Sequence, residues 1–296
     1  MLAGQGTLMD FASFLIQMLN SLQYGLLLFL VASGLTLVFG IMGIINLAHG
    51  SFYMIGAYLA FVLTSATGSL FLAILLGIPL TFIVGAFLEW ALFSHLYKRE
   101  HLEQVLLTYG LILIFEELRS LLVGDEVHGV DIPAIFSASI QLSDVLSYPV
   151  YRLVISGVCI VLAIALYFVI QRTRLGMMIR AGNHDRTMVE ALGININMIY
   201  RVVFALGFAL AALAGMLAAP ISSVFPNMGS HVLIISFVIV VIGGIGSVWG
   251  ALIAALVIGF ADTFGKVLMP DYAGMVVYLV MAVVLLWRPE GILKKG

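Results

Sequence analysis

A succession of long apolar segments with little chain between them constrains this sequence more than any other feature. A helix that crosses a membrane needs about 20 mostly apolar residues, because lipid offers no partner for an unpaired backbone amide or carbonyl. The sequence therefore predicts an all-α, polytopic membrane helix bundle of about nine transmembrane spans. A further short apolar helix over 8–19 either lies along the membrane interface or lengthens the first span. The nine apolar runs lie at 20–40, 42–64, 70–93, 104–123, 150–170, 198–219, 231–248, 250–268 and 271–288.

Composition excludes several other classes of protein. Soluble domains are about 45–50% apolar and about 25% charged, whereas this chain is 63% hydrophobic and 9% charged. The net charge of −2 says nothing about partners, but the lack of a basic patch argues against a nucleic-acid partner. The single cysteine, Cys159, lies in an apolar run and has no second cysteine with which to form a disulfide. We expect residues 1–296 to form one transmembrane domain, with an N-terminus that lacks the positive charge of a cleaved signal peptide.

The positions of the Lys and Arg residues predict how the chain is oriented. Loops that cross the membrane during insertion avoid positive charge, so the Lys/Arg-rich loops stay in the cytoplasm. The loop 94–104, the segment 172–201 and the tail from Arg288 hold two, five and three of the thirteen Lys and Arg residues. These three segments are therefore predicted to be cytoplasmic, including the C-terminus. The acidic loop 124–149 is predicted to face outward, and nine spans then place the N-terminus outside.

Motifs for chemistry are lacking along the chain. The nearest approach to a phosphate-binding GxxxxGK[ST] loop is GFADTFGK at 259–266, which has one residue too many and is followed by Val267. None of the six histidines stands at HExxH spacing, and no GxSxG motif is present. The sequence thus predicts a protein that is not an enzyme, with no nucleotide, metal or cofactor site of its own.

Polar residues within the apolar runs are the candidate functional groups, because burying them in a membrane costs free energy. Segment 39–58 places four of them among glycines, which favours either a locally unwound helix lining a transport path or hydrogen bonds to a neighbouring helix. Two acidic residues in the fourth run either pair with Arg119 or Arg152, line a cavity, or relay protons. The six candidates for the path are Asn46, His49, Ser51, Tyr53, Glu116 and Glu117.

Five stretches stand out in order along the chain: GLTLVFGIMGIINLAHGSFYMIGAY (34–58), TYGLILIFEELRSLLVG (108–124), TRLGMMIRAGNHDRTMVEALGIN (173–195), GGIGSVWGALIAALVIG (243–259) and RPEGI (288–292). Together they resemble the LivH-type permease subunit of branched-chain amino acid ABC importers. The resemblance implies a multi-pass protein of the bacterial inner (plasma) membrane that forms the translocation path together with a second, LivM-like permease. It also implies two cytoplasmic ATPase subunits that use the ATP and a periplasmic substrate-binding protein.

The same resemblance implies that 173–195 is the cytoplasmic coupling loop, which rests on the ATPase. Two glycines, Gly182 and Gly193, are expected to bound a short helix of about ten residues within it. The charged candidates for contact with the ATPase are Arg180, Asp185, Arg186 and Glu190.

Alternatives remain for the cargo and for the driving force. The adjacent acids Glu116 and Glu117 depart from the pattern of the leucine permeases, and related permeases carry urea, amides or aromatic acids. A proton-coupled carrier or a membrane enzyme would use these two acids together with His49. A passive channel would need none of them.

Overall fold

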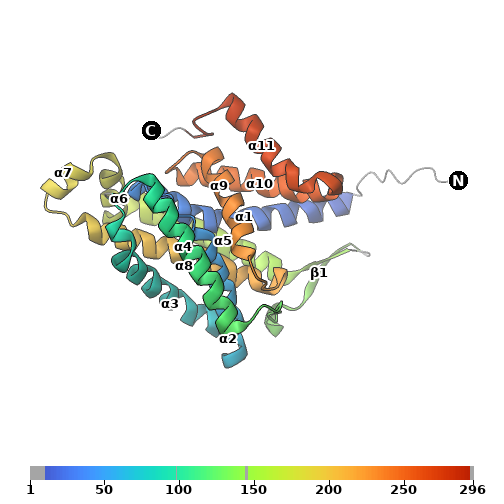
Figure 1. Cartoon of the computed structure of the whole chain (residues 1–296). Helices are drawn as coiled ribbons and strands as arrows, with labels where there is room; N and C mark the ends of the chain where they lie inside the picture. Colours follow the sequence, from blue (N-terminus) through green and yellow to red (C-terminus); the bar gives the residue numbers. More distant parts are fainter. Residues whose placement is uncertain (1–10, 98, 144–145, 294–296) are drawn as a thin grey trace.

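The computed structural model describes residues 11–97, 99–143 and 146–293, and within this part nine long helices form a bundle with one helix for each predicted apolar run (Figure 1). A sixteen-residue helix rises about 24 Å, less than the roughly 30 Å of a bilayer core. For this reason α9 is too short for a full span. Seven described segments are long and apolar enough to cross a membrane, and α4 is not one of them. Helix α4 carries four charged residues, Glu103, Glu116, Glu117 and Arg119. The helices are α1 (Phe11–Met42), α2 (His49–Thr67), α3 (Leu70–Ala91), α4 (His101–Val123), α5 (Val150–Arg172), α8 (Ile196–Ser222), α9 (Met228–Gly243), α10 (Val248–Leu268) and α11 (Ala273–Trp287).

Helices α1 and α8 form the centre of the bundle, and both are almost entirely buried. Helices α8 and α10 pack along α1, and α2 and α3 pack along α8. Lipid provides no hydrophobic drive for helices to associate, so small residues that let backbones approach hold such contacts. At the crossing of α1 and α8, a Cβ atom on Gly34 would lie 2.6 Å from the carbonyl oxygen of Gly207.

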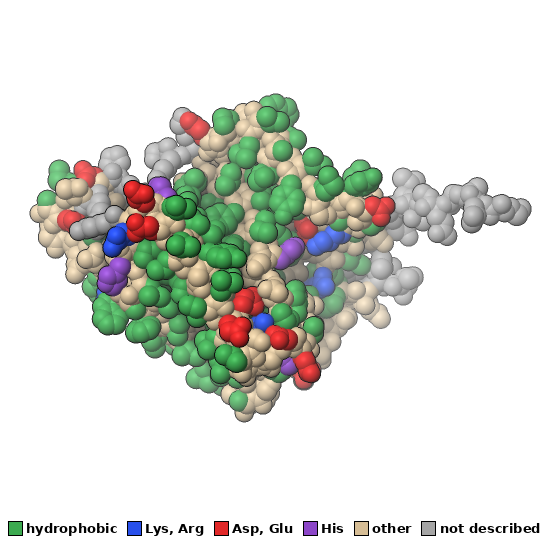
Figure 2. All heavy atoms as spheres, in the orientation of Figure 1, with side chains coloured by type: hydrophobic (Ala, Val, Ile, Leu, Met, Phe, Trp, Pro, Cys, Tyr) green, Lys and Arg blue, Asp and Glu red, His purple; other side chains and the backbone are tan. Residues whose placement is uncertain are grey.

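The outer helices expose apolar side chains, as expected of a surface that faces lipid or another membrane subunit. Phe71 on α3, Leu121 on α4 and Trp287 on α11 are all largely exposed. Hydrophobic side chains dominate the face seen in Figure 2, and the charged ones gather in a few places on it. This distribution is the reverse of that in a soluble protein.

The three Lys/Arg-rich segments lie at one end of the bundle, as the charge distribution predicts. Arg201 at the start of α8 forms an ion pair with Glu89 near the end of α3, which brings the loop after α3 beside the segment before α8. The C-terminal segment joins the end of α9, where the amide of Ile292 donates to the carbonyl of Ile242 at 2.7 Å. The remaining cations lie elsewhere: Arg152 bonds to Asn20 near the opposite end of α1.

The structure decides between the two alternatives for the described part of 8–19, and it adds elements that were not predicted in the loop 124–149. The apolar residues from Phe11 onward are continuous with the first span, so the described part of 8–19 lengthens α1 and forms no separate interfacial helix. The loop 124–149 contains a 3-10 turn, η2 (Ala134–Phe136), and an antiparallel hairpin of β1 (Ser139–Ser143) and β2 (Leu146–Pro149). The hairpin was not predicted, although the alternating Ser-Ile-Gln-Leu-Ser pattern of β1 is typical of a strand.

Candidate translocation path and coupling segment

The chain unwinds between α1 and α2, at residues 43–48. The unwound part is shorter than the 39–58 segment expected to contain it, and Gly43 begins it with a φ of +67°. Helix α2 starts beside the middle of α1, because the Nε2 atom of His49 lies 2.9 Å from the carbonyl oxygen of Val31. The break therefore folds back into the bundle. Irregular backbone at membrane depth is tolerated where it is enclosed by protein or lines a cavity.

Fully buried polar side chains surround this break. Asn46 accepts a hydrogen bond from the amide of Ala48 at 3.1 Å, but its Nδ2 atom has no partner among the described residues. The same holds for the Nδ1 atom of His49. An unmet buried hydrogen bond costs about 1–3 kcal/mol. These two nitrogens make the break a candidate place for contact with a polar substrate.

The other predicted path residues divide between two places. Ser51 and Tyr53 lie in the first turns of α2 and are buried, and Tyr53 lines a cavity of ≈ 380 Å³. Glu116 lies on α4, where its carboxylate is 3.4 Å from the Nε atom of Arg119, so the expected pairing of a glutamate with an arginine is present. Glu117 is exposed on the surface of α4.

The two glutamates lie apart from the break. Arg119 also binds the carboxylate of Asp125 at 2.7 Å and lies over the ring of Tyr58. Tyr58 follows His49 by nine residues along α2, which is roughly 13 Å of helix. Asp125 is outside the spans, and its hydrogen bond from Arg119 lowers the pKa of that carboxyl. Glu116 thus belongs to an ion-pair cluster at the α4 end that leads into the 124–149 loop.

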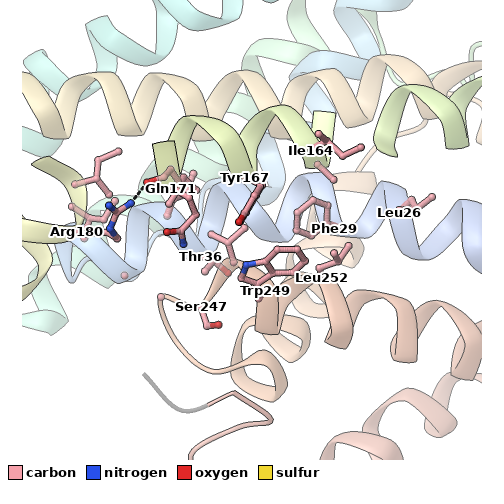
Figure 3. A pocket seen from close by; sticks show the side chains of 18 of the residues that line it. Leu26, Phe29, Thr36, Ile164, Tyr167, Gln171, Arg180, Ser247, Trp249 and Leu252 are labelled. Carbon is pink, nitrogen blue, oxygen red and sulfur yellow. Dashed lines mark hydrogen bonds between the residues drawn. The ribbon is translucent and has the colours of Figure 1, made fainter. Parts of the chain in front are cut away.

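A second cavity, of ≈ 680 Å³, opens on the opposite side of α1, between α5 and α10 (Figure 3). Its walls are mostly apolar, with the rings of Tyr167 and Trp249 5.2 Å apart. Arg180 belongs to the candidate coupling loop 173–195, which we call the coupling segment. It closes one end of this cavity, where its guanidinium donates to the carbonyl of Ile170 at the end of α5 (Figure 3). Arg180 therefore anchors the coupling segment to the bundle.

The coupling segment folds as two helices, α6 (Arg174–His184) and α7 (Arg186–Ala191), so the single helix bounded by glycines is a wrong prediction. Gly182 lies inside α6, where a Cβ atom would come within 2.8 Å of the Ile196 side chain. The break falls at Asp185, because its carboxylate accepts a hydrogen bond from the amide of Met188 at 2.9 Å and so caps α7. Gly193, with a φ of +81°, does lie beyond the end of α7, as expected.

The tip of the coupling segment projects from the bundle and exposes both polar and apolar groups (Figure 1). Asp185 and Glu190 are exposed, whereas the side chain of Arg186 lies outside the described set. Met188 is 59% exposed and Leu192 is 72% exposed. Neither residue is among the predicted ATPase contacts, although their spacing of four places them on one helix face. Exposed apolar groups on a polar projection are typical of a protein contact.

A multi-span apolar bundle with a helix break lined by buried polar groups is the architecture of a membrane transport protein. Residues 17–285 match the family described as branched-chain amino acid transport system / permease component. The chain belongs to this family. No solved structure matches it.

Three curated relatives illustrate the range of this likeness. The chain is 33% identical to the high-affinity branched-chain amino acid transport system permease protein BraD of Pseudomonas aeruginosa, over 95% of each chain. It is 31% identical to the LivH permease of the same kind of system in Escherichia coli K12, over 96% of each chain. The ribose import permease RbsC of Haemophilus influenzae is 30% identical over 79% of this chain and 72% of its own.

Proposed function

We propose that this chain is the inner-membrane permease subunit of an ABC importer for branched-chain or related amino acids. The observation that carries the proposal is the family match over 17–285, which agrees with a broken helix that offers unpaired polar atoms at depth. The proposed assembly contains a LivM-like second permease, two cytoplasmic ATPase subunits and a periplasmic substrate-binding protein. All of residues 1–296 act as one transmembrane domain, with about nine spans and a cytoplasmic C-terminus.

The break between α1 and α2 is the proposed gate of the path. Asn46 and His49 present their unpaired nitrogens there, and Ser51 and Tyr53 follow in the first turns of α2. A small substrate that can accept or donate hydrogen bonds would satisfy these atoms for as long as it passes. We assign Glu116 to the ion-pair cluster with Arg119 and give neither Glu116 nor Glu117 a part in proton relay.

The α6–α7 segment is the proposed link to the ATPase. Its exposed Asp185, Glu190, Met188 and Leu192 form a surface of mixed character, and Arg180 ties the segment to α5. A conformational cycle can be driven only by a partner that binds its states with different affinity. ATP binding and hydrolysis in the separate subunits would supply that difference through this contact.

Reconstitution with each driving force in turn tests the function. The complete assembly in proteoliposomes, supplied with its binding protein, is expected to accumulate radiolabelled L-leucine only when ATP is present on the side of the ATPase subunits. Phenylalanine and urea serve as probes for the alternative cargoes. The isolated chain is expected to be silent, with or without a pH gradient. Uptake by the isolated chain on a pH gradient, or downhill flux that persists without ATP, would replace this function by a proton-coupled carrier or a channel.

A further inference from the structure

The cavity that contains Tyr53 lies at the end of the bundle opposite α7, among the ends of α1, α5, α8 and α10. Its volume of ≈ 380 Å³ falls within the roughly 300–1,000 Å³ of small-molecule sites. Val31 lines the cavity, and the carbonyl oxygen of Val31 is the partner of the His49 ring. The cavity therefore reaches the residue of α1 that binds His49, the first residue after the helix break that forms the proposed gate.

One wall of this cavity carries a cation without an anionic partner. Arg152, at the start of α5, donates from its Nη1 atom to the amide oxygen of Asn20 at 2.6 Å. No carboxylate in the described part of the chain lies within ion-pair distance of its guanidinium. A guanidinium fork matches a carboxylate in shape and charge. The carboxylate of a bound molecule would complete this group.

The other wall carries a nearly buried anion whose partner is free to leave. Asp262 on α10 is paired with Lys266 of the same helix at 2.5 Å, and the two side chains are 9% and 58% exposed. A lysine ammonium on a flexible, solvated stem can turn outward to water. A second ammonium group can then take its place beside Asp262, so that the buried charge stays paired.

Part of the lining is aliphatic, and we call this part the aliphatic floor. It is formed by side chains from α1, α8 and α9, among them Leu27, Leu28, Ile221 and Val232. A branched hydrocarbon side chain fits such a surface. Because Gln23, Ser222 and Thr263 also line the cavity, selection against a sugar or urea rests on the two charged groups.

We infer that this cavity receives an α-amino acid in its zwitterionic form on the way to the gate. Arg152 binds its carboxylate, Asp262 binds its ammonium group in exchange for Lys266, and the aliphatic floor holds a branched side chain. The inference rests on the proposed function for the direction of transport, and it adds a site within the permease itself for amino acids over other cargoes.

Charge-deleting variants of the complete assembly test this site. Arg152→Gln and Asp262→Asn are each expected to lower the initial rate of radiolabelled L-leucine uptake in proteoliposomes about tenfold or more, because each removes a charged hydrogen bond to the substrate. The stimulation of ATP hydrolysis by loaded binding protein should stay within about twofold of wild type, since neither residue touches the coupling segment. Arg152→Lys should recover a large part of the uptake, because it restores the positive charge.

Asp271→Asn is the matched control, because Asp271 is exposed and lies outside the cavity. It should leave uptake unchanged. Unaltered uptake in both charge-deleting variants would overturn the site. A loss of both uptake and ATP hydrolysis that also occurs in Arg152→Lys would overturn it too, because such a loss indicates a structural role for Arg152. A wild-type assembly that takes up no leucine overturns the proposed function instead, so the two failures are distinguishable.

Discussion

Replacing Gly56 with alanine is expected to prevent the chain from folding. A Cβ atom at Gly56 would lie 1.9 Å from the carbonyl oxygen of Ala212 and 2.5 Å from its Cα atom, and both belong to the backbone of α8. No side-chain movement relieves this overlap, so α2 would have to separate from α8 along one of the main packing surfaces of the bundle. The cost exceeds about 3 kcal/mol, a large part of the free energy of unfolding of an ordinary domain.

Size-exclusion chromatography after detergent extraction measures this effect. The Gly56→Ala variant should give little or no monodisperse protein. Gly157→Ala is the control, because Gly157 also lies within a helix but no atom comes within 4 Å of its would-be Cβ. That variant should match the wild-type yield. Wild-type yield and melting temperature for Gly56→Ala would show that α2 and α8 do not approach as described.

The second large effect is expected at the ion pair between Glu89 and Arg201. Glu89 is fully buried, and its carboxylate receives hydrogen bonds from Arg201 at 3.0 Å and from the Tyr97 hydroxyl. Arg201→Met leaves this carboxylate charged and buried with one neutral donor. Only Glu89 is buried in this pair, whereas the Arg201 side chain is 39% exposed, so the expected cost is about 2 kcal/mol, less than for a fully buried pair. The melting temperature of the detergent-solubilised variant should fall clearly.

Two further variants separate charge from packing. Glu89→Gln combined with Arg201→Met removes both charges, so it should regain most of the lost melting temperature. Arg99→Met breaks an exposed pair with Glu103, for which we expect a loss of less than about 0.5 kcal/mol. If Arg201→Met melts like the wild type, the pair does not hold α3 to α8.

The positions of the long helices could be predicted because hydropathy dominates in lipid. Each of the nine apolar runs corresponds to one helix, and most helix ends lie within a few residues of the ends of the predicted run. The depth of each helix could not be predicted. Unwinding within 39–58 was one of the predicted alternatives, but the start of α2 at His49, beside the middle of α1, could not be predicted because it depends on the contact with Val31. The local rule of an acidic N-cap at Asp185, in contrast, was available in the sequence and outweighs the glycine boundary.

The candidate path residues could likewise be predicted from local sequence only in part. Asn46 and His49 could be identified because polar groups within an apolar run are costly wherever they point. Arg152 and Asp262 are 110 residues apart, and each alone resembles an ordinary charge near a helix end. Only the packing of α1, α5 and α10 around one cavity brings them together. Glu89 and Arg201 are likewise distant in sequence and meet only in the folded chain.

In the proposed importer, a separate ATPase binds the α6–α7 segment on the cytoplasmic side of the membrane. A thiol at its tip reports this directly: Leu192→Cys adds an exposed cysteine, while the native Cys159 is buried. A membrane-impermeant maleimide should label Cys-substituted protein in inside-out vesicles stripped of the ATPase subunits, and labelling should be lost when those subunits are bound. Labelling in right-side-out vesicles, or labelling that the bound ATPase leaves unchanged, would contradict the proposed contact between the α6–α7 segment and the ATPase.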